Sequence, residues 1–164
     1  MKILHLGNEE LRKKAEPVAE ITEETAKLVN DMFEAMEKEK GVGLAAPQVG
    51  LGLRIFIVKA DDGVRRAFIN PQIIATSQKQ VVFEEGCLSI PKIYEDVIRP
   101  ESITIQARNE KGRRFTLEAG GYLARIIQHE YDHLEGILFI DRIDKEKKAK
   151  IEQKFIKKAA KKDA

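Results

Sequence analysis

Cysteine and histidine are scarce in this chain of 164 residues, which has one cysteine and three histidines. The single cysteine, Cys87, excludes any disulfide within the chain. In a reducing compartment a lone cysteine is usually a small buried apolar side chain. The sharper alternatives are a nucleophile or a metal ligand, and the composition alone leaves all three roles open.

Long apolar runs are also absent. No stretch approaches the roughly 18 apolar residues that a membrane-spanning helix needs. The first residues, MKILHLGNEELRKK, lack the apolar stretch and the small-residue cleavage site of a secretory signal. We therefore expect a cytoplasmic protein without membrane contact. The length fits a single domain over residues 1–164, and an apolar fraction of 43% can fill one core.

The net charge of +2 conceals an uneven distribution. Residues 145–164 hold nine lysines against three acidic residues, whereas the rest of the chain is net negative. A charge run of this kind is usually a solvated face, but it can also contact a polyanion. Only this basic tail has the character of a polyanion-binding segment, and we expect no specific DNA binding.

The first half of the chain is predicted to contain a helix, a loop and two strands. Residues 21–41 carry an apolar stripe at spacings of three and four, with Thr22 as a plausible N-cap. Residues 41–52, GVGLAAPQVGLG, contain four glycines and a proline and are expected to form an apolar, packed loop. Strands are predicted at residues 53–59 and 66–70, with a turn at the letters DDG between them.

The second half is predicted to begin with strands and end with helices. A strand is expected over residues 80–91, a hairpin over 102–118 and a short strand at 137–141. The helix that follows Gly121 is apolar nearly all round, which indicates burial. With a helical tail, the predicted class is α+β, with mostly antiparallel sheets around a buried central helix and a C-terminal helix.

Two of the three histidines lie in the segment QHEYDHLEG on that buried helix. His129 and His133 are four residues apart, project from one helix face, and can therefore reach one metal ion. Glu130 points roughly 100° away, where a general base for a metal-bound water belongs. The alternative is a pair of helix histidines beside a surface acid. Burial favours the metal site, because unpaired ionisable groups in an apolar interior cost several kcal/mol.

A catalytic metal usually has three protein ligands and a water molecule. Downstream of His133 there is no further histidine, and the donors are carboxylates only. Upstream, Cys87 lies 42 residues before His129, directly after a glycine at the end of a predicted strand. Its thiolate would complete a Cys/His/His site with one open position. Such ligands suit zinc, and iron(II) also accepts them.

Three segments in this order resemble the peptide deformylase family: GVGLAAPQ (41–48), EGCLS (85–89) and QHEYDHLEG (128–136). The similarity covers nearly the whole chain. It implies a hydrolase that removes the N-formyl group from formyl-methionine on new bacterial polypeptides. It also implies Cys87, His129 and His133 as metal ligands and Glu130 as the general acid and base.

The resemblance further implies residues that contact the substrate. Gln48 corresponds to a side-chain donor to the oxyanion, with the backbone N–H of Leu88 beside it. Gly43 corresponds to a position whose backbone meets the substrate peptide in β-strand fashion, and Val42 beside it is expected to bind the substrate as well. From the residues alone, however, Gln48 is more simply read as a cap for its loop.

Other positions are expected to line or support the site. Tyr94 and Ile126 are expected to line an apolar pocket for methionine. Supporting roles fall on an ion pair, Glu85 with Arg99, and on Asp132, which orients the helix or a ligand. The plain alternative for Glu85 and Arg99 is an exposed pair worth under about 1 kcal/mol.

Two further side chains are singled out by their chemistry or position. His5 has no ligand-spaced partner and is expected to be structural. Arg125 stands where some relatives carry an aliphatic side chain, and it is expected at the edge of the pocket entrance.

The resemblance implies one divalent ion, with Fe(2+) favoured and Zn(2+), Ni(2+) or Co(2+) able to occupy the site. Two other functions remain open. One is a zinc HExxH endopeptidase, which has no need for Cys87. The other is a non-catalytic ribosome- or RNA-binding module with a structural metal. In the tail, residues 145–164, an apolar stripe of Ile151, Phe155 and Ala159 at a spacing of four can rest on the body while the lysines face solvent. For this tail we hypothesise a ribosome contact.

Overall fold

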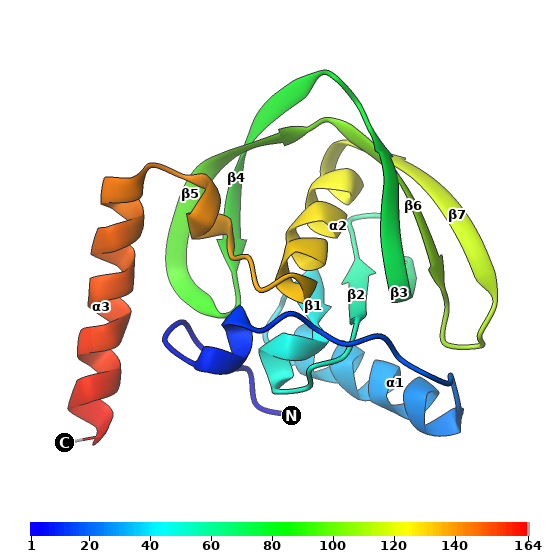
Figure 1. Ribbon diagram of the computed structural model, residues 1–164, viewed down its shortest axis with the longest axis horizontal. Coiled ribbons are helices and arrows are strands. Elements are labelled where there is room, and N and C mark those ends of the chain that lie inside the picture. The colour runs from blue at the N-terminus through cyan, green and yellow to red at the C-terminus, as the bar shows by residue number, and fades with distance from the viewer. Residues whose placement is uncertain (164) are drawn as a thin grey trace.

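The computed structural model describes the backbone of residues 1–163 and the side chains of residues 1–157. Its main sheet has five strands in the order β1-β2-β3-β6-β7, and every neighbouring pair is antiparallel (Figure 1). The strands are β1 (Gly43–Ala45), β2 (Ile55–Lys59), β3 (Arg65–Thr76), β6 (Ser102–Arg108) and β7 (Arg114–Gly120). This arrangement confirms the strands predicted at 53–59 and 66–70 and the hairpin at 102–118.

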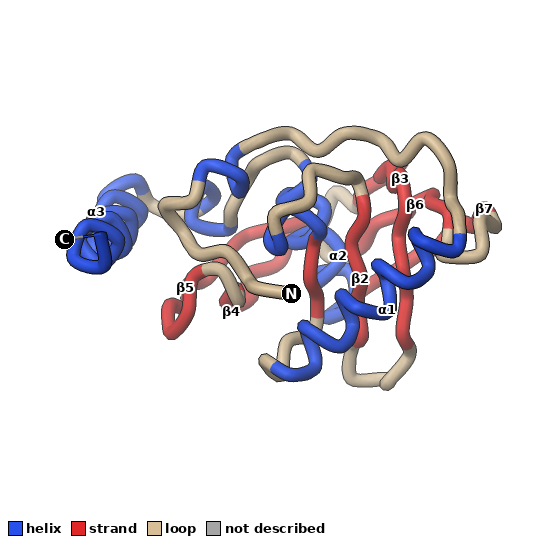
Figure 2. Tube along the Cα trace, turned by 90° about the horizontal axis from the view of Figure 1, so that it is seen from below, coloured by secondary structure: helices blue, strands red, loops and turns tan. Residues whose placement is uncertain are grey.

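One helix covers each face of this sheet, and the apolar side chains of β2 point alternately toward the two helices. Phe56 and Val58 pack on α2 (Gly121–Leu134), whereas Ile55 and Ile57 pack on α1 (Glu23–Lys38). Seen from below, α1 crosses the strands of the sheet (Figure 2). Thr22 precedes α1, and its backbone N–H donates to the Thr25 hydroxyl at 3.0 Å. Successive residues of β2 therefore serve two separate apolar layers.

A second sheet has two strands, β4 (Gln80–Cys87) and β5 (Ile90–Pro100), which lie directly beyond β3 and β6. The two strands pair antiparallel from Gln80 and Pro100 to the turn after Cys87. The strand predicted from residue 80 is therefore confirmed as β4, but it ends at Cys87 and not at Pro91, because the chain reverses there and returns as β5. Lys92 has a positive φ of 66°, which lets the returning strand bend just after the turn.

Two shorter predictions are also corrected. The segment 41–52 is not a plain loop, because its centre forms β1 and the 3-10 turn η2 (Ala46–Val49). β1 exists because Leu44 and its neighbours pair with β2, a contact that is remote in sequence. Residues 137–141 are not a strand either. Phe139 and Ile140 are buried in the 3-10 turn η3 (Phe139–Arg142), which packs on β5.

The C-terminal helix α3 (Lys145–Asp163) rests on the body through one stripe, as predicted. Ile151 and Phe155 are buried in a cluster with residues of β5 and η3. Ala159, the third residue of the expected stripe, lies outside the described side chains. Helix α3 and strand β7 occupy opposite ends of the molecule in both views (Figures 1 and 2). Within residues 1–163, no helix has the length and apolar character needed to cross a membrane.

Candidate active site

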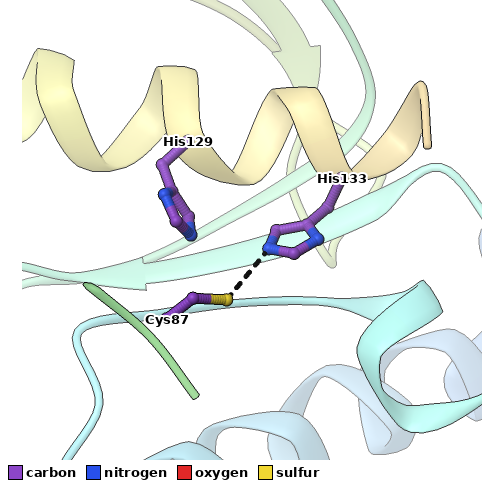
Figure 3. Close-up of side chains that lie close together, drawn as sticks. All are labelled: Cys87, His129 and His133. Carbon is purple, nitrogen blue, oxygen red and sulfur yellow. Dashed lines mark hydrogen bonds between the residues drawn. The ribbon is translucent and has the colours of Figure 1, made fainter. Parts of the chain in front are cut away.

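The three predicted metal ligands come together from two elements. Cys87 ends β4, and His129 and His133 lie one turn apart on α2 (Figure 3). One ligand atom from each residue lies within 4.8 Å of the others, and Cys87 Sγ is 3.4 Å from His133 Nε2. Ligand atoms in a tetrahedral zinc site, with bonds of about 2.0–2.3 Å, lie roughly 3.3–3.8 Å apart. The group is therefore close to the spacing that one ion needs.

The nitrogen atoms of the two histidines differ in their partners. His129 Nδ1 lies 2.9 Å from Glu85 Oε1, which orients the ring and leaves Nε2 for another partner. His133 is 1% exposed, and its Nδ1 has no hydrogen-bond partner among the described residues. Burial lowers the pKa of His133 well below its usual value, and the neighbouring His129 lowers it further. A neutral imidazole is the form that binds a metal.

Glu130 lies beside the ligands and not among them. Its Oε2 is 4.0 Å from His129 Nε2, and its Oε1 is buried without a hydrogen-bond partner in the described part of the chain. Burial raises the pKa of Glu130 to about 7, although the charge of His129 acts against that rise. A buried carboxyl group with a free oxygen and a pKa near neutrality is suited to take and give a proton.

Glu85 connects His129 to two arginines. Its carboxylate accepts hydrogen bonds from Arg99 at 2.6 and 2.9 Å and from Arg125 at 2.8 Å, in addition to the contact with His129. Burial raises the pKa of Glu85, but Arg99 and His129 outweigh that effect and hold the pKa far below its usual value. Glu85 and Arg99 are 5% and 3% exposed, so the alternative of an exposed surface pair was wrong.

The ion-pair network continues from Arg99 to the end of α2. Arg99 Nη1 donates to Asp132 Oδ2 at 2.8 Å, and Arg142 donates to both oxygens of Asp132 at 2.6 and 2.8 Å. Asp132 thus joins α2 to β5 and η3. Among the described residues, the three arginines of this network donate to Glu85, Asp132 and backbone oxygens, and to neither Glu130 nor Cys87.

Arg125 is among the residues that line the cavity beside the site, in line with its expected place next to the pocket, but it is buried. Its side chain is 5% exposed, and it donates to the backbone oxygens of Val81 on β4 and Val97 on β5, each at 2.9 Å. The guanidinium also lies 5.7 Å from the ring of Phe83. Arg125 therefore binds both strands of the two-stranded sheet to α2. An arginine inside an otherwise apolar helix face was the sequence signal for such a buried partner.

Gln48 is buried between the cysteine loop and β1. Its Oε1 accepts the Ala45 N–H at 2.9 Å, so the interpretation as a loop cap is correct for one end of the amide. Its Nε2 lies 3.0 Å from Ser89 Oγ and 3.5 Å from Cys87 Sγ. The other end of the amide therefore points toward the ligand cluster. Ser89, which is fully buried, was given no role from the sequence, although it ends the segment EGCLS (85–89).

A cavity of about 950 Å³ opens beside these groups, and Tyr94, Ile126, Val42, Gly43, Gln48 and Leu88 are among the residues that line it. Tyr94 is 64% exposed, whereas Ile126 is buried. His5 also lines the cavity, but the ligand group found among the described residues does not include it. The arrangement places a cavity with apolar and polar lining next to a buried acid and three convergent side chains that could hold a metal ion.

Comparisons with known proteins agree with this geometry. The family model described as polypeptide deformylase matches residues 1–149. The chain is 51% identical over 148 residues to a peptide deformylase of Treponema pallidum, which covers 90% of this chain and 91% of that protein. The chain is 47% identical over 155 residues to a peptide deformylase of Pseudothermotoga lettingae. The matched region covers 94% of this chain and 90% of that protein.

Solved structures give the same result. A crystal structure of peptide deformylase from Ehrlichia chaffeensis in complex with actinonin superposes with a TM-score of 0.93 at 36% identity, covering 96% of each chain. One from Legionella pneumophila has a TM-score of 0.90 at 39% identity, covering 98% of this chain and 96% of that one. With its fold, its ligand cluster and these similarities over most of its length, the chain belongs to the polypeptide deformylase family.

Proposed function

We propose that Cys87, His129 and His133 hold the divalent ion with which this chain removes the N-formyl group from N-formyl-methionyl polypeptides and releases formate. The observation that carries this proposal is the close approach of Cys87 Sγ to His133 Nε2, 3.4 Å, beside the buried carboxyl group of Glu130. An ion held by these residues would polarise the formyl carbonyl and lower the pKa of a water molecule.

Glu130 is proposed as the proton carrier. It takes a proton from the attacking water and later gives it to the amine that leaves the formyl carbon. Its Oε1 has no hydrogen-bond partner among the described residues and is available for this contact. A pKa of about 7 suits both steps, because the group gains and loses a proton readily near neutral pH.

Gln48 and the backbone N–H of Leu88 are proposed to stabilise the negative charge that develops on the formyl oxygen. Both residues line the cavity, and the Gln48 amide is held by Ala45 and Ser89 on its two ends. A donor fixed before the reaction stabilises developing charge without the cost of reorientation.

The substrate is proposed to lie as an extended strand along β1. This strand is the edge of the five-stranded sheet, and it pairs with β2 on one side only. Val42 and Gly43 both line the cavity, but the Val42 oxygen already accepts the Lys59 N–H of β2 at 2.8 Å. The backbone of Gly43 is therefore proposed to exchange hydrogen bonds with the peptide, and Val42 to contact it beside this position. Tyr94 and Ile126 would contact the apolar methionine side chain.

We propose iron(II) as the ion in the cell, with zinc, nickel or cobalt as possible replacements. A thiolate with two imidazoles accepts all of these ions, so the ligands alone do not select one. Metal analysis of protein purified without oxygen, followed by activity after reloading with each ion, identifies the ion that supports the fastest reaction.

We further propose that the exposed lysines of α3 contact ribosomal RNA, so that the protein acts in the cytosol where formylated chains emerge. Ile151 and Phe155 are buried against the body, while Lys150, Lys154 and Lys157 are exposed. A helix with one face anchored and a basic face free is suited to a phosphate-rich partner.

The deciding experiment measures formate release from N-formyl-methionyl peptides by the metal-loaded protein, together with mass analysis of the products. We expect formate and an intact deformylated peptide. A peptide with an apolar first side chain should react faster than one with a charged side chain. Release of internal fragments without formate would favour the endopeptidase function, and binding without any turnover would favour a structural metal.

A further inference from the structure

Residues 3–6, here called the N-terminal strap, join the two loops that carry the proposed oxyanion donors. The N–H of Leu4 donates to the backbone oxygen of Gln48 at 2.7 Å, and the N–H of Leu6 donates to the backbone oxygen of Ser89 at 2.9 Å. In Figure 1 the N-terminal segment runs past η2, the turn that contains Gln48. The strap thus links a segment near residue 48 to a segment near residue 89.

The side chains of the strap alternate as in an extended strand. Leu4 and Leu6 pack into the cluster that contains β5, η3 and α3. Ile3 packs on the opposite cluster, with α1 and η2, and both Ile3 and His5 line the cavity. In an extended chain, residues two apart direct their N–H groups to the same side at a nearly fixed separation of about 7 Å. The strap therefore acts as a spacer of defined length between the two acceptor oxygens.

Gln48 and Ser89 are also linked directly, since Gln48 Nε2 lies 3.0 Å from Ser89 Oγ. The same two residues are consequently joined twice, once through their side chains and once through the backbone of the strap. A double connection of this kind fixes the distance between the two loops more tightly than either link alone.

We propose that the N-terminal strap is a positioning element, which holds the Gln48 amide and the Leu88 N–H at the separation that the developing oxyanion requires. This inference rests on the proposed function, because it assumes that these two groups stabilise the oxyanion. Leu88 lies between Cys87 and Ser89, so a shift of the Ser89 backbone displaces the Leu88 N–H as well. Misplacement of a catalytic donor by about 1 Å can cost 10²-fold in rate.

The test compares proline with alanine at each strap donor. Leu6→Pro and Leu6→Ala lose the same buried side chain, but only proline loses the N–H that binds Ser89. Leu4→Pro and Leu4→Ala form the corresponding pair for Gln48. We expect each proline variant to have a kcat about 10-fold below its alanine partner, with similar KM and equal metal content. If Leu6→Pro does not fold, the Leu4 pair carries the test.

A double-mutant cycle separates positioning from general destabilisation. In a Gln48→Ala background the difference between the Leu4 variants should largely disappear, because the positioned group is gone. The same loss of kcat in both backgrounds would overturn the proposal, and so would equal kcat values within each proline and alanine pair.

Amide hydrogen exchange gives a readout that does not depend on activity. Segments 46–50 and 86–90 should exchange faster in the proline variants than in the alanine variants. If the wild-type protein released no formate, the proposed function would fail, but faster exchange would still support the strap as a spacer. Unchanged exchange in both segments would overturn the spacer itself.

Discussion

The carboxyl group of Glu130 lies directly against the α-carbon of Gly43. A β-carbon built at Gly43 would stand 2.5 Å from Glu130 Oε2 and 2.9 Å from its Cγ. The edge strand proposed to bind the substrate and the proposed proton carrier are therefore in contact through a position that only glycine can occupy without a shift.

Gly43→Ala should lower kcat by about 10- to 100-fold, because the methyl group forces Glu130 or β1 to move. Metal content should stay at the wild-type level, since the three ligands are untouched. The matched control is Gly52→Ala, where an added β-carbon has no neighbour within 4 Å. Kinetics with a formyl-methionyl peptide check the prediction, and wild-type turnover by Gly43→Ala would show that Glu130 needs no exact placement.

Cys87→Ala and Glu130→Gln should separate the ligand from the proton carrier. The first change removes a thiolate from the ligand cluster and should severely reduce bound metal. The second should retain metal and lower kcat by about 10²–10⁴-fold, which is typical for the loss of a general acid or base. Elemental analysis and formate release measure the two effects. Near-normal metal content in Cys87→Ala would contradict its assignment as a ligand.

Arg125→Met should destabilise the protein by about 3–5 kcal/mol, since it breaks a buried ion pair and removes the donor to two strand oxygens. The exposed Arg113→Met is the matched control and should change stability by less than about 0.5 kcal/mol. Denaturant unfolding of the metal-free proteins measures both values. Equal stability of the two variants would mean that Arg125 does not hold β4 and β5 on α2.

Asp141 is predicted to contribute to stability at neutral pH and not in acid. Burial raises the pKa of Asp141, but hydrogen bonds from Arg12, the Leu138 N–H and Lys148 lower it below the usual 3.8. A lowered folded pKa gives a contribution that is present above pH 4 and is lost as the pH falls through the folded value. Asp141→Asn should therefore be less stable than wild type at pH 7, and this difference should shrink toward pH 3. Thermal unfolding of the metal-free proteins between pH 7 and pH 3 measures this difference. A stability difference that stays constant over this range would contradict the prediction.

Replacing Lys150, Lys154 and Lys157 with glutamate should leave hydrolysis of short formyl peptides intact but weaken ribosome co-sedimentation at low salt. Charges of this kind are screened beyond about 10 Å at 0.1 M salt, so wild-type binding should also fall as salt rises. Removal of residues 148–164 is a poorer test, because it would uncover the apolar cluster around Ile151 and Phe155. Equal co-sedimentation of the variant and wild type would leave the tail without a ribosomal role.

The sequence predicted best what is local. Spacing between residues near one another in the sequence was enough to predict three features. These are the helix with His129 and His133, the hairpin at 102–118, and the stripe of Ile151 and Phe155. Strand β5 was missed because it begins with Ile-Pro and carries polar residues between its few buried positions. Strand β1 has only three residues and depends on pairing with β2, so its own letters indicate a loop.

The resemblance anticipated the ligand set and the support from Glu85, Arg99 and Asp132, but the place of Arg125 in that network could not be predicted. The approach of Cys87 to the two histidines follows from a pattern of motifs, whereas the grouping of Arg99 and Arg125 around Glu85 depends on how β4, β5 and α2 pack. Side chains 14 and 40 residues away from Glu85 meet it only in the folded chain. Periodicity can show that Arg125 is buried, but it cannot name the partner.

No backbone hydrogen bond joins the two-stranded sheet to α2 in the described chain, yet each supplies part of the ligand cluster. An ion held by Cys87 and His129 would cross-link positions 42 residues apart, as a disulfide does. On the usual chain-entropy model, closing a loop of that length lowers the conformational entropy of the unfolded chain. This stabilises the folded state by about 4 kcal/mol. Folding and metal supply are then thermodynamically linked, so resistance to unfolding would rise with the free metal concentration. A protein with a single cysteine would thereby gain a reversible cross-link from the proposed metal ion.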